Sequence, residues 1–138
     1  MFAVLSEINW LAVLVAAVAW TVIGGVYFGV LIAKPYAVAL GRQDAPAGRP
    51  GPLTYVGPMI AGLVMVVTTA VLMRALGIES LGDAVVFGLI IGIGYLAAMT
   101  VTIAINPNFP RPLLYAAINA PGFVLSSTVA SVILGLWR

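Results

Sequence analysis

The chain has 138 residues, of which 63% are hydrophobic and 7% are charged, with a net charge of +2. Soluble domains carry about 25% charged residues, and disordered chains combine low hydrophobicity with high charge, so both classes are excluded. No Cys and no His is present, which removes disulfides, Cys/His zinc sites, His-ligated haem and catalysis by Ser–His or Cys–His pairs. We expect an integral membrane protein that is not an enzyme, holds no cofactor or metal and binds no nucleic acid.

The charged residues leave four long uncharged stretches, at residues 8–33, 50–73, 84–110 and 112–137. A helix crosses the hydrocarbon core of a bilayer with about 20 apolar residues. The sequence therefore predicts four transmembrane helices, at about residues 8–33, 53–73, 82–105 and 113–137. The second and third connections are short, which is typical of antiparallel neighbours. The predicted fold is an all-α membrane protein, a four-transmembrane-helix antiparallel bundle forming one domain over residues 1–138.

Prolines define several boundaries of these predicted helices. The first helix should end at Lys34-Pro35, because a residue before proline is disfavoured in helical geometry. The third should end at Asn106-Pro107 for the same reason. Residues 35–52 are rich in Pro and Gly and are predicted to be a loop, with room for a short interfacial turn at residues 36–40. Residues 17–19 (Ala-Val-Ala) are similar to a signal-peptidase site, but no Lys or Arg precedes them, so we expect a retained helix.

The positive charges predict an orientation. Four of them fall in the first and third connections, and two lie on the side of the termini. Because cytoplasmic loops carry the excess of Lys and Arg, we expect these two connections in the cytoplasm and both termini outside. Trp10 and Trp137 should anchor the helix ends at the interface. The counted residues are Lys34, Arg42, Arg49 and Arg111 on one side, and Arg74 and Arg138 on the other.

Small residues recur every four positions in three of the predicted helices. This spacing makes a groove in which another helix can approach closely, which matters in lipid because hydrophobic collapse does not drive helices together. These stripes either pack the four helices on one another or leave one stripe facing outward to form an oligomer, and both can hold at once. The stripes are Ala17, Thr21, Gly25 and Gly29; Ala84, Gly88 and Gly92; and Ser127, Ser131 and Gly135.

Asn119 is the most informative polar residue inside the predicted spans. Ser and Thr bond the carbonyls of their own helix, but an amide is not fully satisfied in that way and should face another helix. Pro121 lies two residues further on and frees a backbone carbonyl. With Thr100 and Thr102, these residues form a candidate polar site, which either lines a path for a solute or fixes helix register.

The ends of the chain resemble a bacterial family of small membrane proteins known as a domain of unknown function, family 1761. The similar segments are residues 8–16 (INWLAVLVA), 118–120 (INA) and 133–137 (ILGLW). The first helix of that family tends to end in a Trp-Tyr-Ser-Pro-like run, of which only Tyr27 is present here. The resemblance implies four helices in a bacterial inner membrane and supplies no activity.

The function expected from these observations is that of a structural or accessory membrane protein, either a homo-oligomer or a subunit of a larger membrane complex. No charge falls near the middle of a predicted span, which argues against proton- or cation-coupled transport. The alternative is a small oligomeric channel or uncoupled transporter for a small solute or ion. A third possibility is a protein that binds lipid or pigment in apolar grooves.

Overall fold

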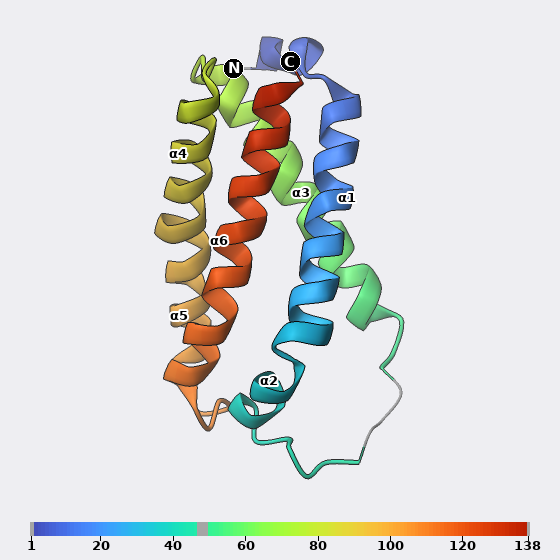
Figure 1. Cartoon of the computed structure of the whole chain (residues 1–138), viewed down its shortest axis with the longest axis vertical. Coiled ribbons are helices and arrows are strands. Elements are labelled where there is room, and N and C mark those ends of the chain that lie inside the picture. The colour runs from blue at the N-terminus through green and yellow to red at the C-terminus, as the bar shows by residue number, and fades with distance from the viewer. Residues whose placement is uncertain (1, 47–49, 138) are drawn as a thin grey trace.

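A computed structural model of the chain describes residues 2–46 and 50–137, and Figure 1 shows it to be built from helices. Arg49 and Arg138, two of the positive charges that predict the orientation, lie outside the described residues. Four helical segments are long and apolar enough to cross a membrane, and they occupy the four stretches that the charge pattern predicted. Their bounds are Trp10–Leu31, Leu53–Ala75, Leu81–Ala104 and Pro112–Leu136.

Two of these segments contain a π-helical part. The first joins α1 (Trp10–Val26) to the π-helix η2 (Tyr27–Leu31), and the third joins α4 (Leu81–Ile91), the π-helix η3 (Gly92–Ala97) and α5 (Ala98–Ala104). The second is α3 (Leu53–Ala75) and the fourth is α6 (Pro112–Leu136). A 3₁₀-helix, η1 (Phe2–Glu7), precedes α1, and a short helix, α2 (Ala33–Ala39), follows η2.

Local sequence signals explain where these helices begin and end. The Asn9 side chain accepts hydrogen bonds from the backbone N–H groups of Leu11 and Ala12, which caps α1. Ser80 caps α4 by accepting a bond of 2.9 Å from the N–H of Asp83. Gly77, with φ of +63°, ends α3 in the left-handed conformation that glycine adopts readily.

The first long segment ends earlier than the sequence predicted. The helix breaks at Ile32, where φ is −111° and ψ is 8°, and Lys34 and Pro35 lie inside α2. The prediction of a stop at Lys34-Pro35 was therefore wrong by a few residues, and α2 occupies the place of the short turn considered at residues 36–40. Proline is tolerated in the first turn of a helix, where its missing N–H would have no partner. In a continuous helix, Pro35 would instead clash with the carbonyl four residues earlier, so the break precedes it.

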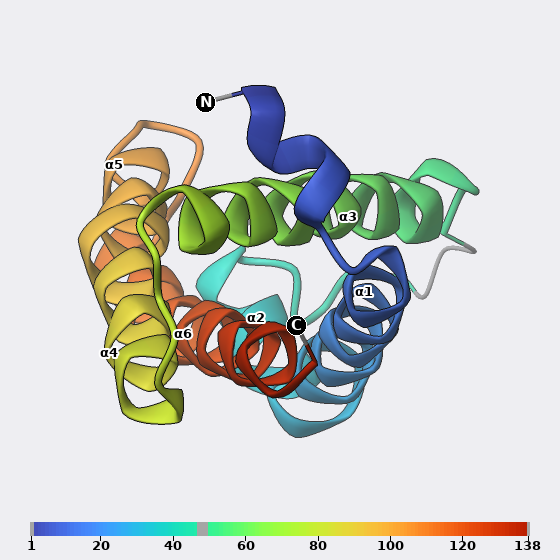
Figure 2. The same ribbon diagram turned by 90° about the horizontal axis from the view of Figure 1, so that it is seen from above.

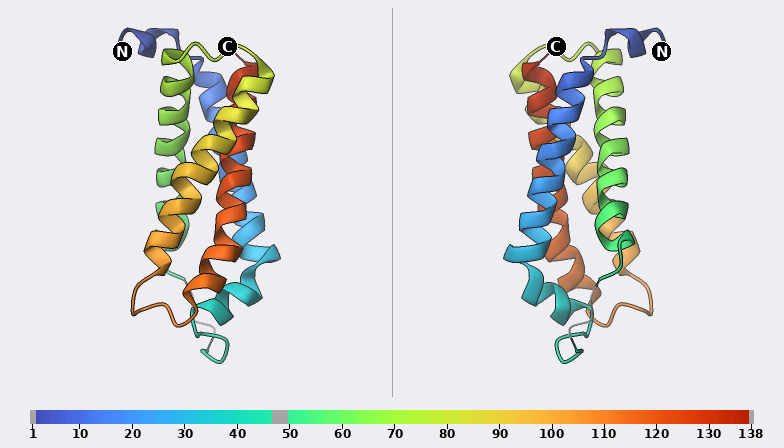
Figure 3. Two further views of the ribbon diagram at one scale, coloured as in Figure 1. Left: turned by 90° about the vertical axis from the view of Figure 1, so that its left-hand side faces the viewer. Right: turned by 90° about the vertical axis from the view of Figure 1, so that its right-hand side faces the viewer.

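Helix α6 is the centre of the molecule. It packs against α1, α3 and α4 and against the shorter segments η3, α5 and α2, and Figure 2 shows it between α4 and α1. Both ends of the described chain lie at one end of the molecule, and the first and third connections lie at the other (Figures 1 and 3). Ala16 of α1, Ala84 of α4 and Ser131 of α6 each have 0% exposure, so small side chains are buried in three of the helices that pack together.

Helix α3 packs against α1, α6 and η1. Across the described residues, no extended contact joins it to α4, η3 or α5. Figure 2 shows α3 crossing one side of the molecule, in a direction different from that of α4. One flank of α3 is therefore left open.

Candidate functional site

The stripes of small residues in α4, η3 and α6 face each other. A Cβ atom added to Gly88 would lie 2.6 Å from the Cα atom of Thr128, and one added to Gly92 would lie 2.9 Å from the Cα of Val124. The hydroxyl of Ser127 donates a hydrogen bond of 2.9 Å to the carbonyl of Gly88, which joins the two helices directly. Only glycine allows the two backbones to come this close.

The same interface continues toward the termini. A Cβ atom on Gly135 would lie 2.9 Å from the Cβ of Ala84, and Ser131 lies between the helices, 3.0 Å from the Cβ position of Gly88. All six residues of the stripes Ala84, Gly88, Gly92 and Ser127, Ser131, Gly135 therefore belong to one internal contact between α4–η3 and α6.

The stripe in the first long segment faces the outside of the molecule at Gly25 and Gly29. Gly25 and Gly29 are exposed, and a Cβ atom on either would have no neighbour within 4 Å. Thr21 is half-buried and donates its hydroxyl to the carbonyl of Ala17 in its own helix. Exposed valines follow each glycine, Val26 at 49% and Val30 at 72% exposure. Among the described residues, nothing packs on this face of α1 and η2 at Gly25 and Gly29.

The buried face of α1 is a different set of residues, which the spacing of small residues did not indicate. It consists of Ala12, Val13, Ala16 and Trp20. The Trp20 ring lies against Gly62 of α3, whose Cβ would be 2.6 Å from the Cδ1 atom of the indole. The glycine at 62 and the large ring at 20 form a matched pair that only the tertiary structure reveals.

Asn119 makes a hydrogen bond within its own helix. Its side chain is buried, and its Nδ2 atom donates a hydrogen bond of 2.6 Å to the carbonyl of Tyr115. A carbonyl four residues earlier lies within reach of an Asn side chain, as it does for Ser or Thr. This bond uses one of the two N–H donors of the amide, so the expectation that the side chain faces another helix stays a prediction.

The two threonines of the candidate polar site also bond within their own helical segment. Thr100 is buried and Thr102 is exposed, because two residues are about 200° apart around a helix. The Thr100 hydroxyl donates to the carbonyl of Leu96 in η3, and that of Thr102 donates to the carbonyl of Ala98 in α5.

Tyr27 covers the region of Pro121 instead. Its hydroxyl donates a bond of 2.9 Å to the carbonyl of Ile118. Its ring packs on Gly122, where a Cβ would come within 2.6 Å of the Cδ1 atom. Pro121 lacks an N–H, so α6 loses a hydrogen bond here. Tyr27 therefore connects η2 to α6 at this point.

An aromatic cluster extends this contact toward the first and third connections. The Phe28 ring is 5.5 Å from that of Phe123, and the Tyr36 ring is 5.8 Å from that of Tyr115. The Phe109 and Tyr115 rings are 4.5 Å apart. These distances are within the range of favourable aromatic pairs, so the cluster ties η2 and α2 to α6.

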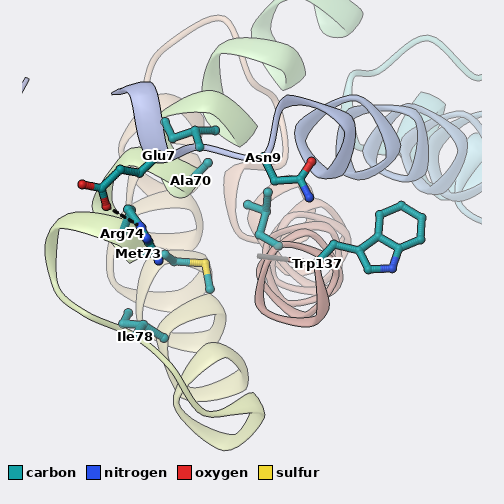
Figure 4. A pocket seen from close by; sticks show the side chains of 9 residues that line it. Glu7, Asn9, Ala70, Met73, Arg74, Ile78 and Trp137 are labelled. Atoms are coloured by element: carbon teal, nitrogen blue, oxygen red, sulfur yellow. Dashed lines mark hydrogen bonds and ion pairs between the residues drawn. The ribbon is translucent and has the colours of Figure 1, made fainter. Parts of the chain in front are cut away.

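At the opposite end, η1 is tied to α3. Arg74 donates from Nε to the Glu7 carboxylate at 2.9 Å, as Figure 4 shows. A cavity of about 50 Å³ lies between this pair, Met73 and Trp137. Trp10 and Trp137 are both about half exposed at this end of the molecule.

A larger hollow follows the open flank of α3. It has a volume of about 390 Å³, and we call it the lateral groove. Its position midway along the molecule distinguishes it from the small cavity near the termini. Its walls come from α3 and from α4 with η3, and Trp20 and Ser127 contribute from α1 and α6. The lining residues are Trp20, Val64, Met65, Thr68, Thr69, Leu72, Ile91, Tyr95, Leu96 and Ser127.

These features define an all-helical protein with four helices long and apolar enough to cross a membrane. The chain belongs to the family described as "Protein of unknown function (DUF1761)", whose model matches residues 11–135. No curated protein and no solved structure matches the chain. The family resemblance seen in the sequence is thereby confirmed.

Proposed function

We propose that this protein is a non-catalytic, four-span antiparallel helical bundle of a bacterial inner membrane that self-associates through the outer face of its first helix. The observation that carries the proposal is the open face at Gly25 and Gly29, in contrast to the closed glycine contacts of α4, η3 and α6. A glycine groove with no internal partner lets a second helix backbone approach closely in lipid. The adjacent valines lose little side-chain freedom on packing, because a helix already restricts their χ1 angle.

The polar residues support a structural role over a conducting one. The hydroxyls of Thr21, Thr68, Thr100, Thr102 and Thr128 each donate to a carbonyl four residues earlier. Asn119 does the same with its amide and lines neither the small cavity nor the lateral groove. A path for a solute needs polar groups turned toward a common space, and these groups bond their own helices.

Substitution of Gly29 by leucine tests the proposal. Gly29→Leu should convert the oligomer to monomer in mild detergent or nanodiscs, measured by native mass spectrometry, because the added side chain fills the groove. The matched control is Gly94→Leu, since Gly94 also lies exposed in a π-helical part and has no neighbour within 4 Å.

Three outcomes distinguish self-association, docking on a larger complex and the absence of any role for this face. An unmodified chain that is oligomeric, with Gly29→Leu monomeric and Gly94→Leu oligomeric, supports the proposal. An unmodified chain that is monomeric when purified alone, but is recovered with a second protein that Gly29→Leu releases, replaces self-association by docking on a larger complex. Equal assembly of both variants overturns the proposed role of this face.

A further inference from the structure

We propose that the lateral groove is a binding site for one hydrocarbon chain of a bilayer lipid. This inference goes beyond the proposed function and rests only on its membrane insertion, since the groove lies on a different face from Gly25 and Gly29. Its position, composition and size each restrict what can occupy it.

The position of the groove places it at the depth of the hydrocarbon core. Trp20, Val64 and Ile91 lie close to the midpoints of the segments Trp10–Leu31, Leu53–Ala75 and Leu81–Ala104. The groove lies between α3 and α4–η3, which make no extended contact with each other among the described residues. In a bilayer, a space between helices at this depth is bordered by lipid tails, and no water is present there to fill it.

The lining of the groove is suited to an apolar occupant. The hydroxyl of Thr68 donates to the carbonyl of Val64, and that of Ser127 donates to the carbonyl of Gly88. Thr69 is buried beside them, and a threonine hydroxyl can bond a carbonyl of its own helix. No charged residue is among those that form the walls. An ionic solute would exchange its hydration for little more than the Tyr95 hydroxyl and the Trp20 indole N–H, which is a poor compensation.

The size of the groove favours a slender chain over a helix. A helix about 10 Å in diameter would fill 390 Å³ within about 5 Å of its length, which is a single turn. A water molecule takes about 30 Å³, and a CH₂ group is of similar size. The volume of 390 Å³ therefore holds roughly thirteen such groups, which is most of the length of one acyl chain.

Trp20 supplies a direct probe of the groove. Its side chain is only 8% exposed and lines the groove, so lipid reaches the indole by entering between α3 and α4–η3. In a chain with Trp10→Phe and Trp137→Phe, Trp20 is the remaining tryptophan. Phospholipids brominated at the middle of the acyl chain should quench its fluorescence strongly in reconstituted vesicles, because quenching by bromine requires near contact.

A pair of threonine variants tests whether the groove carries this contact. Thr68→Phe places a ring in the groove and should abolish most of the quenching of Trp20. The control is Thr102→Phe, because Thr102 is also exposed, makes the same bond within its own helix and lies outside the groove. Far-UV circular dichroism of both variants verifies that each is folded.

The outcomes separate this inference from the proposed function. Quenching that is lost in Thr68→Phe and kept in Thr102→Phe supports the site. Equal quenching in both variants, or none in the parent, overturns it. A chain retaining only Trp10 reports insertion independently, because lipids brominated near the headgroup should quench this exposed residue. Quenching of Trp10 without quenching of Trp20 therefore rejects the groove while leaving the bundle and its assembly in place.

Discussion

Substituting Gly88 by alanine tests the contact between α4 and α6. The new Cβ would lie 2.6 Å from the Cα of Thr128, which is backbone and cannot rotate away. Carbon atoms pack at about 3.5–4.0 Å, so the two helices must separate by about 1 Å. Overpacking of this kind costs about 1–3 kcal/mol. The separation also stretches the bond from Ser127 to the Gly88 carbonyl, and such bonds between membrane helices contribute about 0.6 kcal/mol on average.

The higher helix propensity of alanine offsets part of the cost of overpacking. Alanine is favoured over glycine in a helix by about 1 kcal/mol. In a denaturing detergent, membrane helices remain partly helical, so this gain largely cancels between the two states. We expect Gly88→Ala to lower the free energy of unfolding by about 2 kcal/mol.

Detergent titration in lipid bicelles, followed by tryptophan fluorescence, measures this free energy. The control is Gly94→Ala, because Gly94 lies in the adjoining η3 and a Cβ there meets nothing within 4 Å. Gly94→Ala should be as stable as the parent or slightly more so. If Gly88→Ala proves as stable as Gly94→Ala, the close approach of α4 and α6 is not a feature of the folded protein, and the reasoning is refuted.

Two further predictions concern the opposite end of α6 and the orientation. Tyr27→Phe removes the bond to the Ile118 carbonyl and should lower the free energy of unfolding by about 0.5–1.5 kcal/mol in the same titration. The control Tyr55→Phe should leave it unchanged, because Tyr55 is exposed. Equal effects of the two substitutions would show that the Tyr27 bond does not stabilise the fold. Because the chain has no Cys, single Gln43→Cys and Glu79→Cys variants report topology, and an impermeant maleimide added to intact cells should label only position 79. Labelling of position 43 alone would invert the proposed orientation.

The positions of the four long helices could be predicted from the sequence. Ten charges distributed over 138 residues leave stretches of the length that a bilayer requires, and nothing else in the chain competes with that signal. The break near the end of the first segment was misplaced by a few residues, since Pro35 is accommodated inside the first turn of α2. The sequence shows that a proline is present, but the geometry of the preceding turn decides where the helix ends.

The candidate polar site could not be predicted in the same way. A four-residue offset lets one N–H of the Asn119 amide bond the Tyr115 carbonyl, and the sequence alone does not show whether an amide bonds within its own helix or across to another. Tyr27 was visible as a residue shared with the family, but its contact with Gly122 spans residues that are distant in sequence. The signal for such a pair is a large ring on one helix and a glycine on another, and a single sequence does not show which ring packs on which glycine.

By itself, the sequence determined the number, length and approximate bounds of the four apolar helices, because these follow from the distribution of charges along one dimension. Only the tertiary structure decided which face of each helix lies inside. In a soluble protein, the polar side of a helix marks its outer face. Here apolar residues surround every helix, so the stripe with Gly88 and the stripe with Gly25 look alike in sequence. The fold buried the first against α6 and left the second exposed, because only the packing partner distinguishes two grooves of the same size.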